Sequence, residues 1–422
     1  MNEIVAGFDL CDDYSQVSCY ISGELEPKDI EFSRGENIYS IPTVVCKKRG
    51  ADEWLIGEDA FQAALSGAGI MVDKLLRLVR KNGTATIEGK KYTASQLLTI
   101  YLEKVMDIVK NKMGETLVTM LVFTVQELDE RMIEVLTKAA EANQVPEECI
   151  HIISHSESYH YYVLSQRKEL WTNLAVLFDL TDEGLHYYEM EVTKGETPNI
   201  ANTIHNDLEE RFSLDILDNS SGKKMADSIM VSCARRLFNK KNISSVYLTG
   251  KGLASCEEWS TEFLKFVCEK RRVFFCQNLF CKGAAYLAAD YLREYTAYPY
   301  TCLCEGRISS TVSMEVRHNG ATKRLLLAEE GTNWHEAKSV VDFILDEMDV
   351  VEIMISKAGE SSYQKITIPL ENFPNRQNKT TRVQMVLTFH SEHDMTIRLL
   401  DKGFGELFPA TDVMIKQEIK ML

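Results

Sequence analysis

Residues that interrupt regular structure are scarce in this sequence, which has 22 glycines and 8 prolines among 422 residues. This scarcity excludes collagen-like and low-complexity chains. The 45% apolar and 26% charged residues are typical of globular rather than disordered proteins. A chain of this length exceeds one ordinary hydrophobic core, so the sequence predicts two or three domains.

Basic residues are also in deficit, with 47 Lys and Arg against 63 Asp and Glu and a net charge of −16. Because phosphate contacts need basic patches, we predict no nucleic-acid partner and interpret short stretches such as Lys223–Lys224 as helix-face charges. No apolar run approaches the roughly 18 residues of a membrane-spanning helix, so no membrane partner is predicted either. The opening MNEIVAGFDL is typical of a strand, because it lacks the basic and long apolar regions of a signal peptide.

Cysteine spacings that bind zinc are missing as well. The eleven cysteines are scattered and odd in number, and no two of them stand in a Cys-x-x-Cys pair. We therefore predict buried or reduced thiols in a cytoplasmic protein rather than a zinc or disulfide framework.

The first part of the chain alternates strand-like and helix-like segments. Two apolar runs of strand length, Ile4–Leu10 and Leu174–Leu180, each precede a turn and a second strand-like segment. The first turn is predicted at Cys11–Gln16 and the second at Thr181–Gly184. Because further strand and helix patterns follow each pair, we predict two related α/β lobes.

Two predicted helices carry the spacing of a capping box at their N-termini. Thr93 with Gln96 opens a helix that continues through Val105. Thr124 with Glu127 is predicted to open the helix that follows the apolar strand ending at that threonine.

The hydrophobic period changes to two after about Thr296. Alternation is clear in the segment that contains Val383, Met385 and Leu387, and Asn319-Gly320 between two such segments is a strong hairpin signal. Several short strands joined by turn residues predict an antiparallel β-sandwich.

The order of these segments resembles the actin-like ATPase superfamily, and most closely the DnaK-type, seventy-kilodalton heat-shock chaperones. AGFDLCDDYSQVSCY resembles the first phosphate loop of that family, and VLFDLTDEGLHYYEM the second. VYLTGKGLA is similar to the adenosine loop, HIISHSESYHYY and CKGAAYLAA to the two connecting helices, and WLIGEDAF and KYTASQLLTIYLEKV to further segments of the same domain. ITIPLENFPN and TRVQMVLTFHSEHDMTIRLLD resemble the closing strands of the peptide-binding domain.

The resemblance implies a fold and its domains. Residues 1–296 would form an α/β two-lobed, actin-like (ribonuclease-H-like) nucleotide-binding-type domain, with lobe I at about 1–170 and lobe II at about 171–296. Residues 303–422 would form an antiparallel β-sandwich domain that resembles the chaperone peptide-binding domain, without a helical lid.

The resemblance also assigns candidate nucleotide-binding residues. In the family, two aspartates position hydrated Mg²⁺ and glycine-rich turns approach the nucleotide. The candidates are Asp9 and Asp179 for the metal and its waters, Lys74 for phosphate, Gly184 in the second loop, and Gly250, Lys251 and Gly252 in the adenosine turn.

The two phosphate loops depart from the family pattern in the groups that would face the triphosphate. Asp12 and Asp13 in the first loop, and Asp182 and Glu183 in the second, replace small residues. A like-charge contact at 4 Å costs on the order of 4 kcal/mol at an effective dielectric of 20, so these acids are predicted to oppose phosphate. His155 stands where the family has a glutamate near the reacting centre, and about 70 residues separate Asp179 from Gly250, roughly half the family's span.

Other interpretations of these residues stay open. Asp9 and Asp179 are either metal ligands or turn-initiating aspartates kept with the fold. The four loop acids either hold a cation or form solvated hairpin tips, which we favour. We interpret His155, His160 and His186 as structural, since they lack ligand spacing on one face.

These observations predict a chaperone-like protein with degraded phosphate loops, a pseudo-ATPase that binds protein or extended peptide without hydrolysing ATP and needs no cofactor. The alternative is an atypical Mg-ATP-binding ATPase chaperone in which Asp9 and Asp179 hold Mg²⁺ and the phosphate loops adopt another geometry. A third hypothesis, an actin-like filament scaffold, is disfavoured by the C-terminal strands. A β-sandwich would bind peptide by adding a strand or by filling an apolar cleft.

Overall fold

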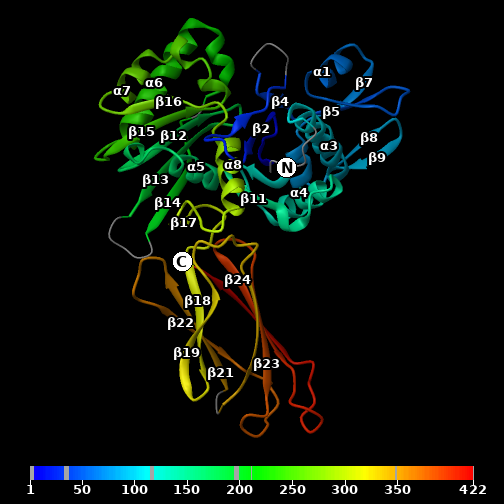
Figure 1. Ribbon diagram of the computed structural model, residues 1–422, viewed down its shortest axis with the longest axis vertical. Coiled ribbons are helices and arrows are strands. Elements are labelled where there is room, and N and C mark those ends of the chain that lie inside the picture. Colours follow the sequence, from blue (N-terminus) through cyan, green and yellow to red (C-terminus); the bar gives the residue numbers. More distant parts are fainter. Residues whose placement is uncertain are drawn as a thin grey trace. The chain divides into compact units, whose positions relative to one another are not determined.

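The computed structural model describes residues 4–32, 38–114, 118–193, 199–210, 212–346 and 349–421, and its fold is mixed α/β (Figure 1). The chain divides into two compact units. The first comprises Met1–Val192 with Thr203–Pro299, and the second comprises Thr193–Asn202 with Tyr300–Leu422. The segment at 193–202, which sequence reasoning left in the first domain, thus belongs to the second unit.

The first sheet of unit 1 is built around a completely buried strand, β1. It has the order β11-β10-β1-β2-β3, with β4 beside β2; β1 pairs antiparallel with β2 and parallel with β10. Helices α3 and α4 cover one face through a continuous apolar core. The elements are β1 (Ile4–Leu10), β2 (Tyr14–Ile21), β3 (Lys28–Asp29), β4 (Ser40–Pro42), β10 (Val118–Val125), β11 (Ile150–Ser154), α3 (Ala94–Lys112) and α4 (Glu130–Ala142).

The second sheet repeats this strand order. Its path β16-β15-β12-β13-β14 again places an antiparallel hairpin, β12–β13, beside parallel strands. Helices α6 and α7 pack on it through a second apolar core. The elements are β12 (Leu174–Leu180), β13 (Leu185–Val192), β14 (Ile200–Asp207), β15 (Ile243–Thr249), β16 (Arg272–Phe275), α6 (Ser220–Leu237) and α7 (Thr261–Val267).

Smaller elements complete unit 1. They form a three-stranded sheet (β6-β5-β7), a hairpin (β8–β9), two short helices and five 3₁₀ turns. The elements are β5 (Val45–Lys48), β6 (Trp54–Ile56), β7 (Gly69–Val72), β8 (Thr84–Ile87), β9 (Lys90–Thr93), α1 (Gly57–Leu65), α2 (Leu75–Arg80), η1 (Glu147–Cys149), η2 (Lys168–Leu170), η3 (Leu214–Asp218), η4 (Lys251–Leu253) and η5 (Cys256–Glu258).

Two helices, α5 (His155–Leu164) and α8 (Leu279–Tyr291), lie in the middle of unit 1 and pack closely against each other (Figure 1). Glycines make this packing possible. A Cβ on Gly7 of β1 would lie 2.1 Å from the Cys281 carbonyl oxygen of α8, and one on Gly283 would lie 1.9 Å from the Ser158 carbonyl oxygen of α5. The backbones of β1, α5 and α8 are therefore in direct contact.

Unit 2 contains two four-stranded antiparallel sheets, β19-β18-β21-β22 and β20-β23-β24-β25. Alternate residues of β23 are buried, as its period of two predicts, and β24 follows the same pattern except that Thr396 is buried as well. Asn319 and Gly320 turn between β18 and β19 with φ of 53° and 79°, which confirms the hairpin. The strands are β17 (Thr301–Leu303), which pairs with the start of β14, β18 (Ser310–His318), β19 (Ala321–Ala328), β20 (Lys338–Ile344), β21 (Val350–Lys357), β22 (Gln364–Pro369), β23 (Arg382–Phe389), β24 (Asp394–Asp401) and β25 (Met414–Lys420).

The structure confirms one predicted helix start and corrects another. The Thr93–Gln96 capping box is present at the start of α3. The cap of α4, however, is Asp129, whose side chain accepts from the Met132 N–H. Thr124 does not cap that helix because it pairs with strands on both sides within β10.

The first hairpin turn is tighter than the predicted Cys11–Gln16. The Cys11 N–H donates to the Tyr14 carbonyl, and β2 already begins at Tyr14. This brings two adjacent acids, Asp12 and Asp13, to the tip of the hairpin.

A buried ion pair in unit 2 makes the folding stability depend on pH in the acid range. Asp401 receives two hydrogen bonds of 2.7 Å from the Arg376 guanidinium and one of 2.8 Å from the Thr411 hydroxyl. Burial raises the pKa of Asp401, but these donors outweigh it and lower the pKa from 3.8 to about 2.

A lowered folded-state pKa stabilises the protein above the unfolded value and loses that effect as the pH falls. We expect the free-energy advantage of the native chain over Asp401→Asn to shrink by about 2 kcal/mol between pH 6 and pH 2. Urea unfolding of both proteins across that range measures the difference. A pH-independent gap would mean that Asp401 is not held ionised.

None of the helices described by the structure combines the length and the apolar character that crossing a bilayer requires.

Candidate functional site

The two hairpin tips of unit 1 face a shared set of basic side chains. One tip joins β1 to β2 at Cys11–Asp13, and the other joins β12 to β13 at Thr181–Gly184. The Thr181 N–H donates to the Gly184 carbonyl, and the Thr181 hydroxyl accepts from the Glu183 N–H, so the second turn is also closed internally.

Arg77 connects the two tips. Its backbone N–H donates to the Asp12 carboxylate at 3.0 Å, and its guanidinium donates to Glu183 at 3.2 Å. Asp12 is only 7% exposed. The prediction of solvated hairpin tips is therefore wrong for Asp12, because its carboxylate is buried and accepts a hydrogen bond from the Arg77 backbone N–H.

Lys74 and Lys251 neutralise the two remaining loop acids. Lys74, in the left-handed conformation just before α2, forms an ion pair with Asp13. Lys251 donates to Asp182 at 3.0 Å and lies 5.9 Å from the Tyr14 ring centre. Each acid predicted to oppose phosphate thus has a basic partner of its own or shares Arg77.

The same ion pairs determine how the pKa values of Lys74 and Lys251 are shifted. Burial acts to lower the pKa of Lys74, but the hydrogen bond to Asp13 and the nearby charges of Asp12 and Glu183 raise it overall. The hydrogen bond to Asp182 raises the pKa of Lys251. Both lysines are held as cations by protein carboxylates.

Below the tips, Asp9 and His155 form a buried pair. The His155 Nε2 atom lies 2.8 Å from the Asp9 carboxylate, and the side chains are 3% and 8% exposed. The imidazole stacks on the Phe280 ring at 4.0 Å between centroids. The thiol of Cys11 also points to Asp9, with 3.7 Å between sulfur and oxygen.

The Cys11 thiol is held in its protonated form. Burial raises its pKa well above the usual value, and the carboxylates of Asp9, Asp179 and Glu183 raise it further.

Asp179 lies on the second sheet in the position that corresponds to Asp9 on the first. It is 5% exposed and opposite His186 in the strand register. Burial raises its pKa, while the neighbouring imidazoles of His186 and His155 act to lower it. The charge of Asp9, with which Asp179 was predicted as a pair, also acts to raise the pKa of Asp179.

Two of the predicted glycines, Gly250 and Gly252, are required because a side chain there would overlap neighbouring atoms. Gly250 adopts φ of +88°, and a Cβ there would lie 2.4 Å from the Asp179 carboxylate. A Cβ on Gly252 would lie 2.5 Å from the Leu180 side chain. Gly184 is open to the space around it, with φ of +155°. Gly250 is thus the glycine that lets the turn after β15 approach the buried Asp179.

Sequence reasoning missed a second histidine cluster beside Asp179. The His186 Nδ1 atom lies 2.6 Å from Asp207, its Nε2 atom lies 3.1 Å from the Gln126 amide, and His205 joins the same cluster. The signal was the His-x-Asp alternation at 205–207, which places both side chains on one face of β14. His160, by contrast, bonds the Thr203 hydroxyl at 3.0 Å, a structural role.

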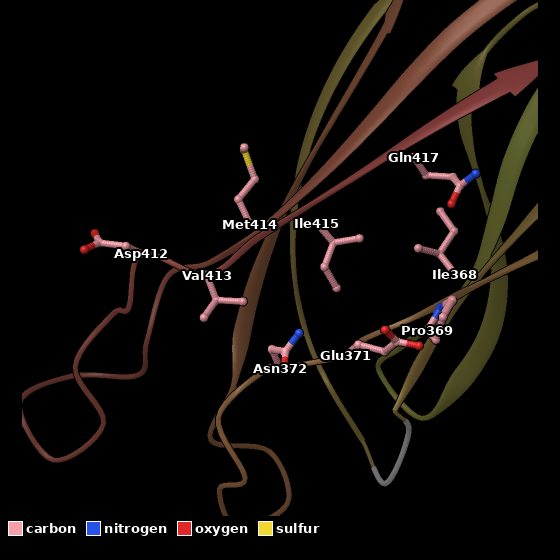
Figure 2. Close-up of a pocket in the computed structure, with 9 residues that line it drawn as sticks. All are labelled: Ile368, Pro369, Glu371, Asn372, Asp412, Val413, Met414, Ile415 and Gln417. Carbon is pink, nitrogen blue, oxygen red and sulfur yellow. The ribbon is translucent and has the colours of Figure 1, made fainter.

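Unit 2 carries a separate groove of about 480 Å³ beside β22 and β25, one edge strand from each of its two sheets (Figure 2). Figure 2 shows Val413 and Ile415 extending to one side of β25 and Met414 to the other. The rim carries the carboxylates of Glu371 and Asp412. The lining of the groove is therefore mostly polar, with Val413 and Ile415 as the apolar part of its floor, and it lies beside strand edges.

All eleven cysteines are free thiols in the structure.

Two family models match this chain. Residues 26–305 match the family described as family of unknown function (DUF5716), C-terminal, and residues 307–421 match a domain of unknown function (DUF8552). No curated protein matches the sequence. The first match covers more than half of the chain, and neither description states an activity.

Proposed function

The chain belongs to the family of unknown function DUF5716 (C-terminal), and from the chemistry of its site we propose that it is a heat-shock-chaperone-like pseudo-ATPase. In this proposal it works in the cytoplasm as a non-hydrolysing module that binds protein or extended peptide. It uses no cofactor and has no nucleic-acid or membrane partner.

The fold part of the proposal has topological support. Both sheets of unit 1 use the same strand order, with an antiparallel hairpin at the centre and parallel strands beyond it. Each hairpin carries an aspartate at the matching place, Asp9 and Asp179. A duplicated arrangement of this kind supports an actin-like, two-lobed domain, and the two antiparallel sheets of unit 2 support a β-sandwich after it.

The observation that carries the functional proposal is the pairing of loop acids with basic side chains. Lys74 is bound to Asp13, Lys251 to Asp182, and Arg77 to both Asp12 and Glu183. The cations that a triphosphate would need are already neutralised by carboxylates of the same chain. A nucleotide would have to break these pairs and then face the released acids at close range.

The energetic consequence is large. One like-charge contact at 4 Å is worth about 4 kcal/mol at an effective dielectric of 20, which is about three orders of magnitude in affinity. Since four acids occupy the loops, we propose that Mg-ATP has no measurable affinity for the native chain.

A second candidate, the atypical Mg-ATP-dependent chaperone, is favoured by one feature. Asp9 and Asp179 are both buried near the strand ends, as ligands of a hydrated Mg²⁺ would be. His155, however, already takes one oxygen of Asp9, which leaves that carboxylate less available to a metal-bound water.

The groove of unit 2 is the proposed peptide site. Strands β22 and β25 each pair on one side within the described residues, so an extended chain can add beside β25 by backbone hydrogen bonds. Apolar side chains of that chain would contact Val413 and Ile415, and a basic residue would pair with Glu371 or Asp412. We therefore expect a preference for extended peptides that alternate apolar and basic residues.

We expect Ile415→Asp to weaken such peptides at least about tenfold, because it places a charge on the apolar floor of the groove. Fluorescence anisotropy with the strongest binder from a peptide array measures this change. Val340→Asp is the matched control, since Val340 is an exposed strand residue outside the groove. Equal weakening by both variants, or no binding of any extended peptide, would contradict this site.

A further inference from the structure

Three side chains beneath the first hairpin tip converge as metal ligands do. The donor atoms of Asp9, Cys11 and His155 all lie within 4.8 Å of one another. They come from the end of β1 and from the first turn of α5, segments more than 140 residues apart in the chain. The fold, rather than local sequence, brings them together.

Their spacing suits a tetrahedral ion. Bonds of about 2.0 Å to oxygen or nitrogen and about 2.3 Å to sulfur place neighbouring ligand atoms roughly 3.3–3.5 Å apart. The Cys11 sulfur lies 3.7 Å from the Asp9 oxygen, and the His155 nitrogen lies 2.8 Å from it. These two distances differ from the tetrahedral values by about half an ångström or less, and all three donor atoms lie within 4.8 Å of one another.

Asp179, on the second sheet, is a buried carboxylate outside this cluster. It is not among the groups whose donor atoms lie within 4.8 Å of one another. With three protein ligands, the fourth position of a tetrahedral ion is open to a water molecule.

The donor set selects the metal. Thiolate, imidazole and carboxylate together suit Zn²⁺ and similar thiophilic divalent ions, whereas Mg²⁺ prefers oxygen ligands with several waters. Coordination would replace the proton on the Cys11 sulfur, and a nitrogen lone pair of neutral His155 would bind the ion in place of the hydrogen bond to Asp9. The Cys11 thiolate and the Asp9 carboxylate together balance the two positive charges of the ion.

We propose that Asp9, Cys11 and His155 form a binding site for a Zn²⁺-class ion, with the fourth ligand position open to water. The site needs no nucleotide and does not depend on peptide binding by unit 2. It ties the first sheet to helix α5 directly beneath the paired loop acids.

Cobalt provides the direct test, because a Cys-bound Co²⁺ gives a thiolate charge-transfer absorption. We expect the metal-free full chain to bind Co²⁺ with that absorption, and Zn²⁺ to displace it. Cys11→Ser should abolish the band and weaken Zn²⁺ binding by at least about 100-fold, since even outer partners of metal ligands are worth about 10–100-fold. Cys149→Ser, at another partly buried thiol, should leave both unchanged.

Absence of the cobalt band in the native chain would overturn the proposal. So would metal binding that survives Cys11→Ser and disappears in His205→Gln, because that result assigns the metal to the His186–His205–Asp207 cluster.

Discussion

Replacing Gly283 with alanine is expected to lower the free energy of unfolding by about 4 kcal/mol, the upper end for a single substitution. The new methyl group would lie 1.9 Å from the Ser158 carbonyl oxygen and 2.8 Å from the Ser158 side-chain oxygen. Because the nearest atom belongs to the backbone of α5, no rotamer change relieves the overlap. Helices α5 and α8 would have to separate, and α8 also packs on β1 and β10.

Gly67→Ala is the matched control for Gly283→Ala. Gly67 has φ of +71°, and a Cβ there would meet no other atom within 4 Å, so the substitution adds backbone strain without overlap. We expect it to cost about 1 kcal/mol. Urea unfolding followed by circular dichroism measures both variants. Equal costs for the two would show that the α5–α8 contact adjusts easily.

Removing the loop acids is expected to create nucleotide affinity. The triple variant Asp12→Gly, Asp182→Gly and Glu183→Gly removes three carboxylates and frees Arg77 and Lys251 for phosphate. Loss of even one close like-charge contact corresponds to about a thousandfold gain in affinity for Mg-ATP. Isothermal titration calorimetry compares the variant with the native chain.

A control is needed for the loss of negative charge alone, because the triple variant removes three of the negative charges that give the native chain its net charge of −16. Glu103→Gln, Asp107→Asn and Glu141→Gln remove the same charge from exposed positions on α3 and α4. This control should gain no affinity. A triple variant that also gains none would place the defect elsewhere, for example in the short segment between Asp179 and Gly250.

Local patterns predicted much of the secondary structure. The strand Leu174–Leu180, the Thr93–Gln96 capping box and the Asn319-Gly320 hairpin have the predicted form because short-range interactions determine them. The cap at Thr124 failed for a long-range reason, since pairing on both sides holds that residue in β10.

The candidate site likewise has features that local sequence predicted and features that depend on contacts between distant residues. Sequence reasoning identified the four loop acids and the pair Asp9 and Asp179, all of which lie in or just after strand-like runs. It did not predict Arg77 as their partner or the burial of Asp12, because 65 positions separate these residues in the chain. Nor did it predict that Cys11 would join His155, a contact that exists only once β1 and α5 are in place.

Calorimetric titration of Mg-ATP into the native chain tests the central claim most directly. The claim is that ion pairs within the chain occupy the basic side chains that would otherwise bind the phosphates of a nucleotide. We predict no binding heat at nucleotide concentrations up to about 1 mM, which corresponds to a binding free energy weaker than about −4 kcal/mol. A micromolar dissociation constant would contradict this claim, because it would require Lys74, Arg77 and Lys251 to leave their carboxylate partners for the triphosphate.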